Sequence, residues 1–95
     1  MSVYFLAEIT KIIDKEMYQE YIQKARLIVL KFGGKYMLKS DKLIPVTGDW
    51  DLEKIILINF PSKEKMRKCF QSAEYNAVKH LRINSTESKS LVIEE

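Results

Sequence analysis

Three side chains near residue 80 could together bind an acidic ligand. Glu74, Tyr75 and Arg82 lie in one helix-forming stretch, and Tyr75 and Arg82 are nearly two helical turns apart. The phenol and the guanidinium should therefore lie roughly in line on one helix face, beside its apolar side. A guanidinium next to a phenol suits a carboxylate or an enolate, because a bidentate contact adds orientation as well as energy. Tyr18 or Trp50 could close such a pocket.

The same side chains also have a purely structural interpretation. Glu74 would stabilise the positive end of its helix, and Arg82 would pair with a loop acid such as Asp49 or Asp51. Trp50 would then anchor an interface between protein chains instead of lining a pocket. The sequence allows both interpretations, so a ligand site at these residues is a hypothesis.

The other residues that commonly do chemistry indicate neither catalysis nor a cofactor. His80, the only histidine, falls on the outer face of the same helix, and Cys69, the only cysteine, has no base nearby. We interpret them as a surface imidazole and a buried structural thiol. Metal and haem sites need clustered ligands, and the Gly33-Gly34 pair follows a helix instead of preceding one as a phosphate loop does. We expect no metal, haem or nucleotide cofactor, and we assign no catalytic residue.

Composition excludes several classes of protein. The 95 residues suffice for one domain over residues 1–95, and 46% apolar residues suffice for its core. A single cysteine excludes an internal disulfide framework. No apolar run approaches the roughly 18 residues of a membrane span, and no basic segment precedes the apolar residues of the N-terminus. We therefore expect a cytoplasmic protein without a membrane partner.

The charge pattern does not favour a nucleic-acid partner. The net charge of +3 is small, and we interpret the basic cluster at residues 63–68 as a solvent-exposed helix face. RNA binding on a sheet would need stacking aromatic residues, whereas the run from Ile55 to Phe60 is mainly aliphatic.

Periodicity predicts an alternation of strands and helices. Asp14, Ser62 and Ser72 are predicted helix N-caps, and Gly33 is a predicted helix end. In the third helix we expect Ala77, Val78 and Leu81 to face inward. The expected strands cover residues 3–9, 35–39, 54–60 and 88–94, and the expected helices cover 14–32, 63–71 and 73–84.

The resulting order, βαββαβ with the second helix in two pieces, predicts a ferredoxin-like α+β fold with an antiparallel sheet. The first and third strands should be central and the lysine-bearing second and fourth should be edges. Both central strands are apolar on both faces, yet the helices cover only one face. The face without helices would receive either Tyr4 and Leu6 or Val3 and Phe5 from the first strand. From the third strand it would receive those apolar side chains of residues 55–60 that point to the same side. We therefore expect a two-fold homodimer that packs sheet against sheet.

The chain resembles the DUF1330 family of small bacterial proteins of unknown function. The matching pieces are the strand Tyr4–Ile9, the helix with Tyr18 and Tyr21, Phe32-Gly33-Gly34-Lys35-Tyr36, Gly48-Asp49-Trp50, Phe60-Pro61-Ser62, Ser72-Ala73-Glu74-Tyr75 and Leu81-Arg82. One departure from the family is Lys39, at a position where family members often carry arginine. Lysine offers an anion only a point charge, so a bidentate contact at this position would be lost. The family in turn resembles the dimeric α+β barrel superfamily, which includes cofactor-free monooxygenases, isomerases and haem enzymes.

Two functions from different classes follow from these observations. In the first, the protein is a non-catalytic homodimer that binds a small acidic metabolite between helices and sheet, or binds nothing. In the second, the resemblance implies a cofactor-free enzyme of the monooxygenase or isomerase type. The sequence does not decide whether the protein is an enzyme, because this fold supports many chemistries.

Overall fold

The computed structural model describes residues 2–95, and Met1, the first residue of the domain expected over 1–95, lies outside the described residues. Residues 2–95 form four strands and three helices. They follow one another as β1 (Val3–Ile12), α1 (Lys15–Lys31), β2 (Lys35–Ser40), β3 (Lys54–Phe60), α2 (Lys63–Phe70), α3 (Ala73–Ser85) and β4 (Thr86–Glu94). The predicted order, with the second helix in two pieces, is confirmed.

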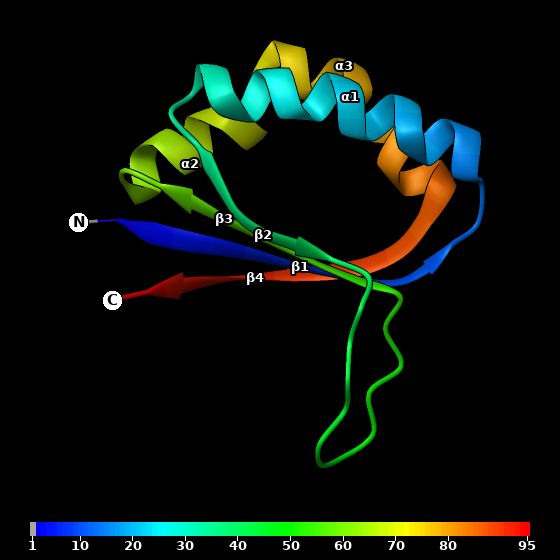
Figure 1. The fold of residues 1–95 in the computed structure, drawn as a ribbon. Helices are drawn as coiled ribbons and strands as arrows, with labels where there is room; N and C mark the ends of the chain where they lie inside the picture. Colours follow the sequence, from blue (N-terminus) through cyan, green and yellow to red (C-terminus); the bar gives the residue numbers. More distant parts are fainter. Residues whose placement is uncertain (1) are drawn as a thin grey trace.

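The strands form one antiparallel sheet in the order β2-β3-β1-β4, and all the helices lie over the same face of it (Figure 1). This is the predicted ferredoxin-like α+β arrangement, with β1 and β3 central. Both β1 and β4 are longer than predicted, because Ile12 pairs with Thr86 beyond a shift of register after Ile9. Polar Thr10 and Lys11 interrupt the apolar alternation there, so the sequence pattern ends before the strand pairing does.

The helices begin where the sequence predicts. The three capping side chains accept backbone N–H groups as follows: Asp14 from Met17 at 3.0 Å, Ser62 from Lys65 at 3.1 Å and Ser72 from Tyr75 at 3.0 Å. Such a cap typically contributes about 1 kcal/mol. The chain leaves α1 through Gly33, whose φ of +86° lies in the left-handed region that favours glycine. Of the helices described for residues 2–95, none combines the length and apolar character that crossing a bilayer requires.

The core lies between the helices and the covered face of the sheet. It contains the odd-numbered residues of β1 as far as Ile9 and the even-numbered residues 56–60 of β3, packed against α1 and α2. Phe60 and Cys69 are completely buried at its centre. The expectation that Ala77 faces inward is wrong: Ala77 is exposed, and α3 buries Tyr75, Val78 and Leu81 instead. At 100° per residue Ala77 falls about 40° outside the arc that these residues span.

The opposite face of the sheet has no layer over it within residues 2–95. Cross-strand pairs place seven apolar side chains there: Tyr4, Leu6, Leu38, Ile55, Leu57, Leu91 and Ile93. Leu38 and Leu91 are about half exposed, at 53% and 51%. The sequence left open which residues of the central strands face away from the helices, and the register assigns Tyr4, Leu6, Ile55 and Leu57 to that side. We call this set of seven residues the uncovered face.

The connection between β2 and β3 is a long arm. Residues 41–53, which we call the arm, project from the sheet on the side opposite the helices (Figure 1). Ile44 and Val46 are 88% and 90% exposed, and Trp50 is 57% exposed. Two hydrogen bonds hold the base of the arm: the Ile12 N–H donates to Glu53 Oε2 at 2.8 Å, and the Glu53 N–H donates to the Ile9 carbonyl at 2.8 Å.

Candidate functional site

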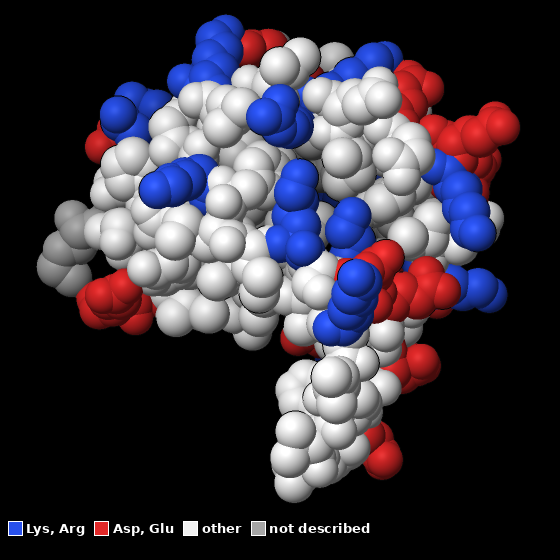
Figure 2. Space-filling model, viewed as in Figure 1, with Lys and Arg blue, Asp and Glu red and all other residues white. Residues whose placement is uncertain are grey.

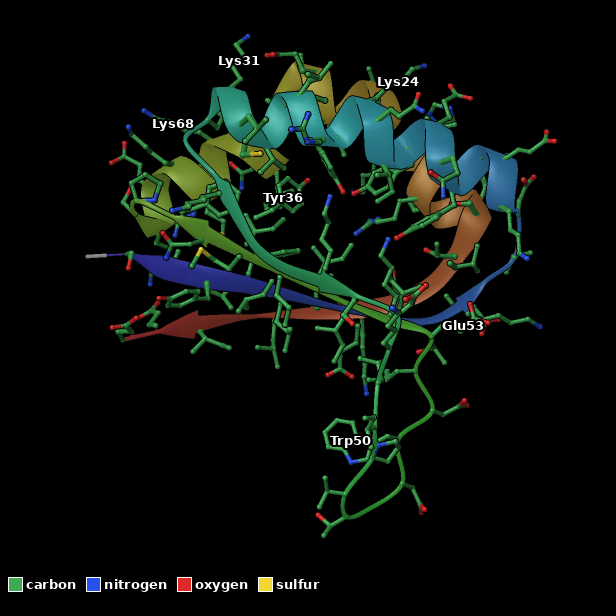
Figure 3. The ribbon with its side chains drawn as sticks, in the orientation of Figure 1. Lys24, Lys31, Tyr36, Trp50, Glu53 and Lys68 are labelled. Atoms are coloured by element: carbon green, nitrogen blue, oxygen red, sulfur yellow. The ribbon has the colours of Figure 1, made fainter. Side chains whose placement is uncertain are left out.

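A cavity of about 80 Å³ lies between the helix layer and the sheet. Small side chains leave this space: Ala7 and Ser90 face each other across β1 and β4, and Ala25 lies opposite on α1. Around them stand four tyrosines, one arginine and three hydroxyl residues of β4, namely Tyr18, Tyr21, Tyr36, Tyr75, Arg82, Thr86, Ser88 and Ser90. In Figure 3 Tyr36 points from β2 into the space beneath α1.

Two of the tyrosines are joined to each other across the helix layer. The hydroxyl groups of Tyr21 on α1 and Tyr75 on α3 lie 2.9 Å apart, within hydrogen-bond distance. Their rings meet edge to face, with centroids 6.4 Å apart. One hydroxyl proton is used in this bond, so the second remains free to donate to a ligand.

The hydroxyl group of Tyr18 has no hydrogen-bond partner in the part of the chain that the structure describes. Tyr18 is 2% exposed, and its oxygen makes no hydrogen bond to any group of residues 2–95. A buried hydroxyl without a partner is costly, because it gives up water without a replacement. A side chain that lines a cavity and keeps an unused donor can serve a ligand that enters there.

Burial keeps these phenols protonated. It raises the pKa of Tyr18 and of Tyr36 to about 12. The pKa of Tyr21 is raised further, mainly by burial and also by the hydrogen-bonded Tyr75, while the positive charge of Arg82 opposes the rise. At neutral pH Tyr18, Tyr21 and Tyr36 are therefore hydrogen-bond donors and not bases.

Cations surround the tyrosines. The Nζ atom of Lys54 lies 5.0 Å from the ring centroid of Tyr18, and that of Lys39 lies 5.1 Å from the ring centroid of Tyr36. Desolvation lowers the pKa of Lys54, because it is partly buried. In Figure 2 lysine and arginine side chains gather on the visible face between the helix layer and the sheet.

Two cations belong to the cavity wall itself, Lys89 and Arg82. The Nζ of Lys89 lies 3.9 Å from Glu8 Oε1, so the cation of the wall without a carboxylate partner among residues 2–95 is Arg82. It lines the cavity and also the open hollow beside β4, together with Thr86 and Ser88. None of the ion pairs among residues 2–95 involves Arg82. The described cavity lining holds no carboxylate and no imidazole. The site is therefore apolar and donor-rich, and its positive charge is not neutralised from within.

The structure brings together three of the five residues that the sequence suggests for a site. Tyr18, Tyr75 and Arg82 line the one cavity. Glu74 does not, because it points to the end of α1 and its Oε2 lies 2.6 Å from the Nζ of Lys31. Trp50 is on the arm, remote from the cavity (Figure 3), and its Nε1 donates to the Thr47 carbonyl at 2.6 Å.

The structure also shows where three other carboxylates lie relative to Arg82 and the cavity. Asp49 and Asp51, the loop acids that would have paired with Arg82, lie on the arm and make no ion pair with it. Glu8 points to the opposite side of the sheet, where its Oε1 lies 3.9 Å from Lys89 Nζ.

Sequence reasoning missed Tyr21 and Tyr36 as parts of the site. The sequence places Tyr21 in the helix expected over residues 14–32 and Tyr36 in the edge strand expected over residues 35–39, without a role for either hydroxyl group. The available signal was residue type, because a buried hydroxyl needs a partner where phenylalanine would not. Their relation to Tyr75 depends on how α1, α3 and β2 pack together.

The two reactive residues outside the cavity behave as predicted. His80 is exposed, and Cys69 is buried, with its pKa raised to about 11 by burial. A neutral thiol is a poor nucleophile. Among residues 2–95 no three acidic, histidine or cysteine side chains are grouped to hold a metal ion.

Several solved structures share this fold. A protein of unknown function from Rhodopseudomonas palustris, RPA0582, aligns with a TM-score of 0.80 at 13% identity, over 99% of this chain and 82% of that one. SnoaB, a cofactor-independent oxygenase from Streptomyces nogalater, aligns with a TM-score of 0.73 at 8% identity, over 99% and 92%. A dimeric ferredoxin-like protein of unknown function from Thermobifida fusca aligns with a TM-score of 0.68 at 9% identity, over 100% and 92%. At these identities the likeness shows the fold alone.

The amino-acid sequence also matches a protein family. No curated protein matches the chain. A family described as a domain of unknown function, DUF1330, matches residues 2–95. The match spans every strand and helix described above, including the tyrosines and the arginine of the cavity. The chain belongs to the DUF1330 family.

Proposed function

We propose that the protein is a homodimer in which the cavity of each protomer binds a small organic acid. The observation that carries the proposal is the guanidinium of Arg82, which lines an apolar cavity without any carboxylate partner among residues 2–95. A cation in this position is stabilised when an anion enters and offers bidentate acceptors.

The cavity lining defines the chemistry of the ligand. A carboxylate or enolate oxygen accepts from Arg82, and a second oxygen accepts from the free proton of the Tyr21–Tyr75 pair or from Tyr18. The ligand body lies against apolar residues such as Ala7 and Ile56. A volume of about 80 Å³ restricts it to a few heavy atoms, because a cavity that holds benzene measures ~150 Å³.

A cofactor-free enzyme is the second candidate, and the likeness to the oxygenase SnoaB favours it at the level of fold. Proton abstraction from a substrate needs a base. The described cavity lining has no carboxylate or imidazole, and burial keeps the phenols of Tyr18 and Tyr21 protonated. These features support binding over catalysis, and an enzyme here would need a substrate that is already ionised, which Arg82 would stabilise.

The homodimer is the state that best accommodates the uncovered face. Seven apolar side chains lie there without a covering layer in residues 2–95. Contiguous apolar surface of a few hundred Å² normally marks an interaction site. A protein of the same fold from Thermobifida fusca is described as dimeric, which supports a dimer here. The expected cytoplasmic location stays a prediction.

Substitution of Arg82 tests the binding proposal. Wild-type protein, Arg82→Ala and Arg82→Lys are screened by thermal shift against acetate, pyruvate and acetoacetate. We expect at least one acid to raise the melting temperature of the wild type, Arg82→Ala to abolish that rise, and Arg82→Lys to keep part of it as a point charge. Arg67→Ala, which removes an exposed arginine of α2, is the matched control and should respond like wild type.

Two outcomes would contradict binding at Arg82. One is an unchanged ligand response in Arg82→Ala. The other is a lower melting temperature of Arg82→Ala with no acid stabilising the wild type, which would assign Arg82 a structural role.

The dimer is tested separately by light scattering coupled to size exclusion, where the wild type should give about twice 11.2 kDa. Leu57→Lys places a charge in the uncovered face and should give monomers, whereas Ile83→Lys changes an exposed residue of α3 and should remain dimeric. A wild-type monomer at all concentrations would refute sheet-to-sheet packing. Ile58, the neighbouring position, is unsuitable because it is buried beneath the helices.

A further inference from the structure

We propose that the arm, residues 41–53, clasps a second copy of this chain and is a separate part of the dimer interface. This inference rests on the homodimer proposed above, but it concerns a different surface. The arm leaves the protomer on the side of the uncovered face (Figure 1), so a chain that covers this face must meet the arm.

The arm has the chemistry of an interface and not that of a solvated loop. Its aliphatic residues Ile44 and Val46 are 88% and 90% exposed, and Trp50 is more than half exposed. In Figure 2 most of its visible surface is uncharged. Clustered exposed apolar residues with an aromatic anchor are typical of binding surfaces, whereas single exposed ones are not.

A groove connects the arm to the uncovered face. It measures about 410 Å³ and is lined by Leu43, Ile44, Val46, Trp50 and Leu52 of the arm and by Ile55 of β3. Ile55 also belongs to the uncovered face. The two apolar surfaces are therefore continuous, and one partner can cover both.

The arm is held in its direction before any partner binds. Glu53 accepts from the Ile12 N–H through its side chain and donates its own N–H to the Ile9 carbonyl, which fixes the base of the arm to β1. Trp50 is bound to the Thr47 carbonyl. An arm that is already ordered loses less conformational entropy when it binds.

The length of the arm points to a second copy as its occupant. About six residues lead from the sheet to the tip of the arm and about six lead back, so at roughly 3.3 Å per residue an extended half of the arm spans ~20 Å. Packed sheets lie only ~10 Å apart. The arm of one protomer therefore passes the whole sheet of its partner and flanks it. A two-fold axis repeats this contact, so that both arms and both faces are covered at once.

Trp50 provides a direct test, because it is the only tryptophan. Its fluorescence emission is recorded while the wild-type protein is diluted from tens of micromolar to nanomolar, with the molecular mass followed by light scattering. If the arm clasps the partner, emission should be blue-shifted in the dimer and move to longer wavelength in the same concentration range in which the mass halves.

Substitutions on the arm give a second readout. Ile44→Ser with Val46→Ser should weaken the dimer by about tenfold or more, the loss expected when interface anchors are removed. Ile83→Ser is the matched control, since Ile83 is equally aliphatic and 56% exposed but lies on α3. It should leave the dimer unchanged.

The outcomes separate this inference from the proposed dimer. A dimer whose Trp50 emission does not change on dilution, and which is not weakened by the arm substitutions, overturns the clasp and leaves the sheet-to-sheet dimer standing. A wild-type monomer at every concentration overturns both. Dimers that weaken only in the arm variant, with the emission change, support the clasp.

Discussion

Replacing Tyr18 by phenylalanine removes one oxygen atom from the cavity wall and should not destabilise the protein. The Tyr18 hydroxyl is buried and has no hydrogen-bond partner in residues 2–95. Such an orphaned group costs about 1–3 kcal/mol of desolvation. The free energy of unfolding of Tyr18→Phe should therefore equal that of the wild type or exceed it by about 1 kcal/mol.

Tyr21→Phe is the matched control, because it removes the same atom from a hydroxyl that does have a partner. It breaks the 2.9 Å contact to Tyr75 and leaves the Tyr75 hydroxyl unsatisfied in the helix layer. We expect a loss of about 1–2 kcal/mol. The free energies of unfolding of the two variants should thus differ by about 1–3 kcal/mol, with Tyr18→Phe the more stable.

Urea unfolding, followed by circular dichroism at one fixed protein concentration, measures the difference. The concentration must be fixed because association stabilises the folded state by mass action. Under the binding proposal Tyr18→Phe also lowers the affinity for the stabilising acid while the free protein keeps its stability. If Tyr18→Phe is destabilised as much as Tyr21→Phe, the Tyr18 hydroxyl has a partner in solution, and it is not held free for a ligand.

Three further predictions concern the fold around the cavity. The contribution of Tyr18 to the free energy of unfolding should be complete below pH 10 and be lost between pH 10 and about 12, because the unfolded phenol ionises near pH 10 whereas the pKa of Tyr18 in the folded state is raised to about 12. This difference in pKa corresponds to about 2–3 kcal/mol. In alkaline unfolding titrations Tyr18→Phe should therefore lose less stability than the wild type. Gly34→Ala should lower the free energy of unfolding by about 2–4 kcal/mol in urea, because an added Cβ would lie 2.5 Å from Cγ1 of Val29 and 2.9 Å from Cε1 of Phe60. A loss below ~1 kcal/mol would show that the neighbouring side chains move aside. Ser72→Ala should cost about 1 kcal/mol by removing the cap that accepts the Tyr75 N–H, and Ser62→Ala, at the equivalent position of α2, should cost about the same; an unchanged stability would mean that water replaces the cap.

The features of this fold that depend on near neighbours in the chain could be predicted from the sequence. Asp14, Ser62 and Ser72 cap helices because each side chain reaches an N–H three residues ahead. Gly33 ends α1 for a similarly local reason. The apolar run of residues 54–60 is a central strand because both of its faces are apolar. These interactions need no knowledge of the remaining chain.

The candidate site could be predicted only in part. Tyr75 and Arg82 share a wall of the cavity because one helix carries both, and helical spacing is a local property. Glu74 is the neighbour of Tyr75 in sequence, yet it faces Lys31 at the end of α1. Its position depends on the crossing of two helices that are far apart in the chain.

Tertiary structure alone decided where the cavity is and what surrounds it. The space exists because Ala7 and Ser90 meet across two strands whose register is set by long-range pairing. The hydroxyl groups of Tyr21 and Tyr75 come within 2.9 Å although 54 positions separate them. The sequence by itself determined which faces are apolar, where each helix begins and that one sheet face would lack cover. It could not determine which side chains meet, because a contact between distant residues depends on the packing of every element that lies between them.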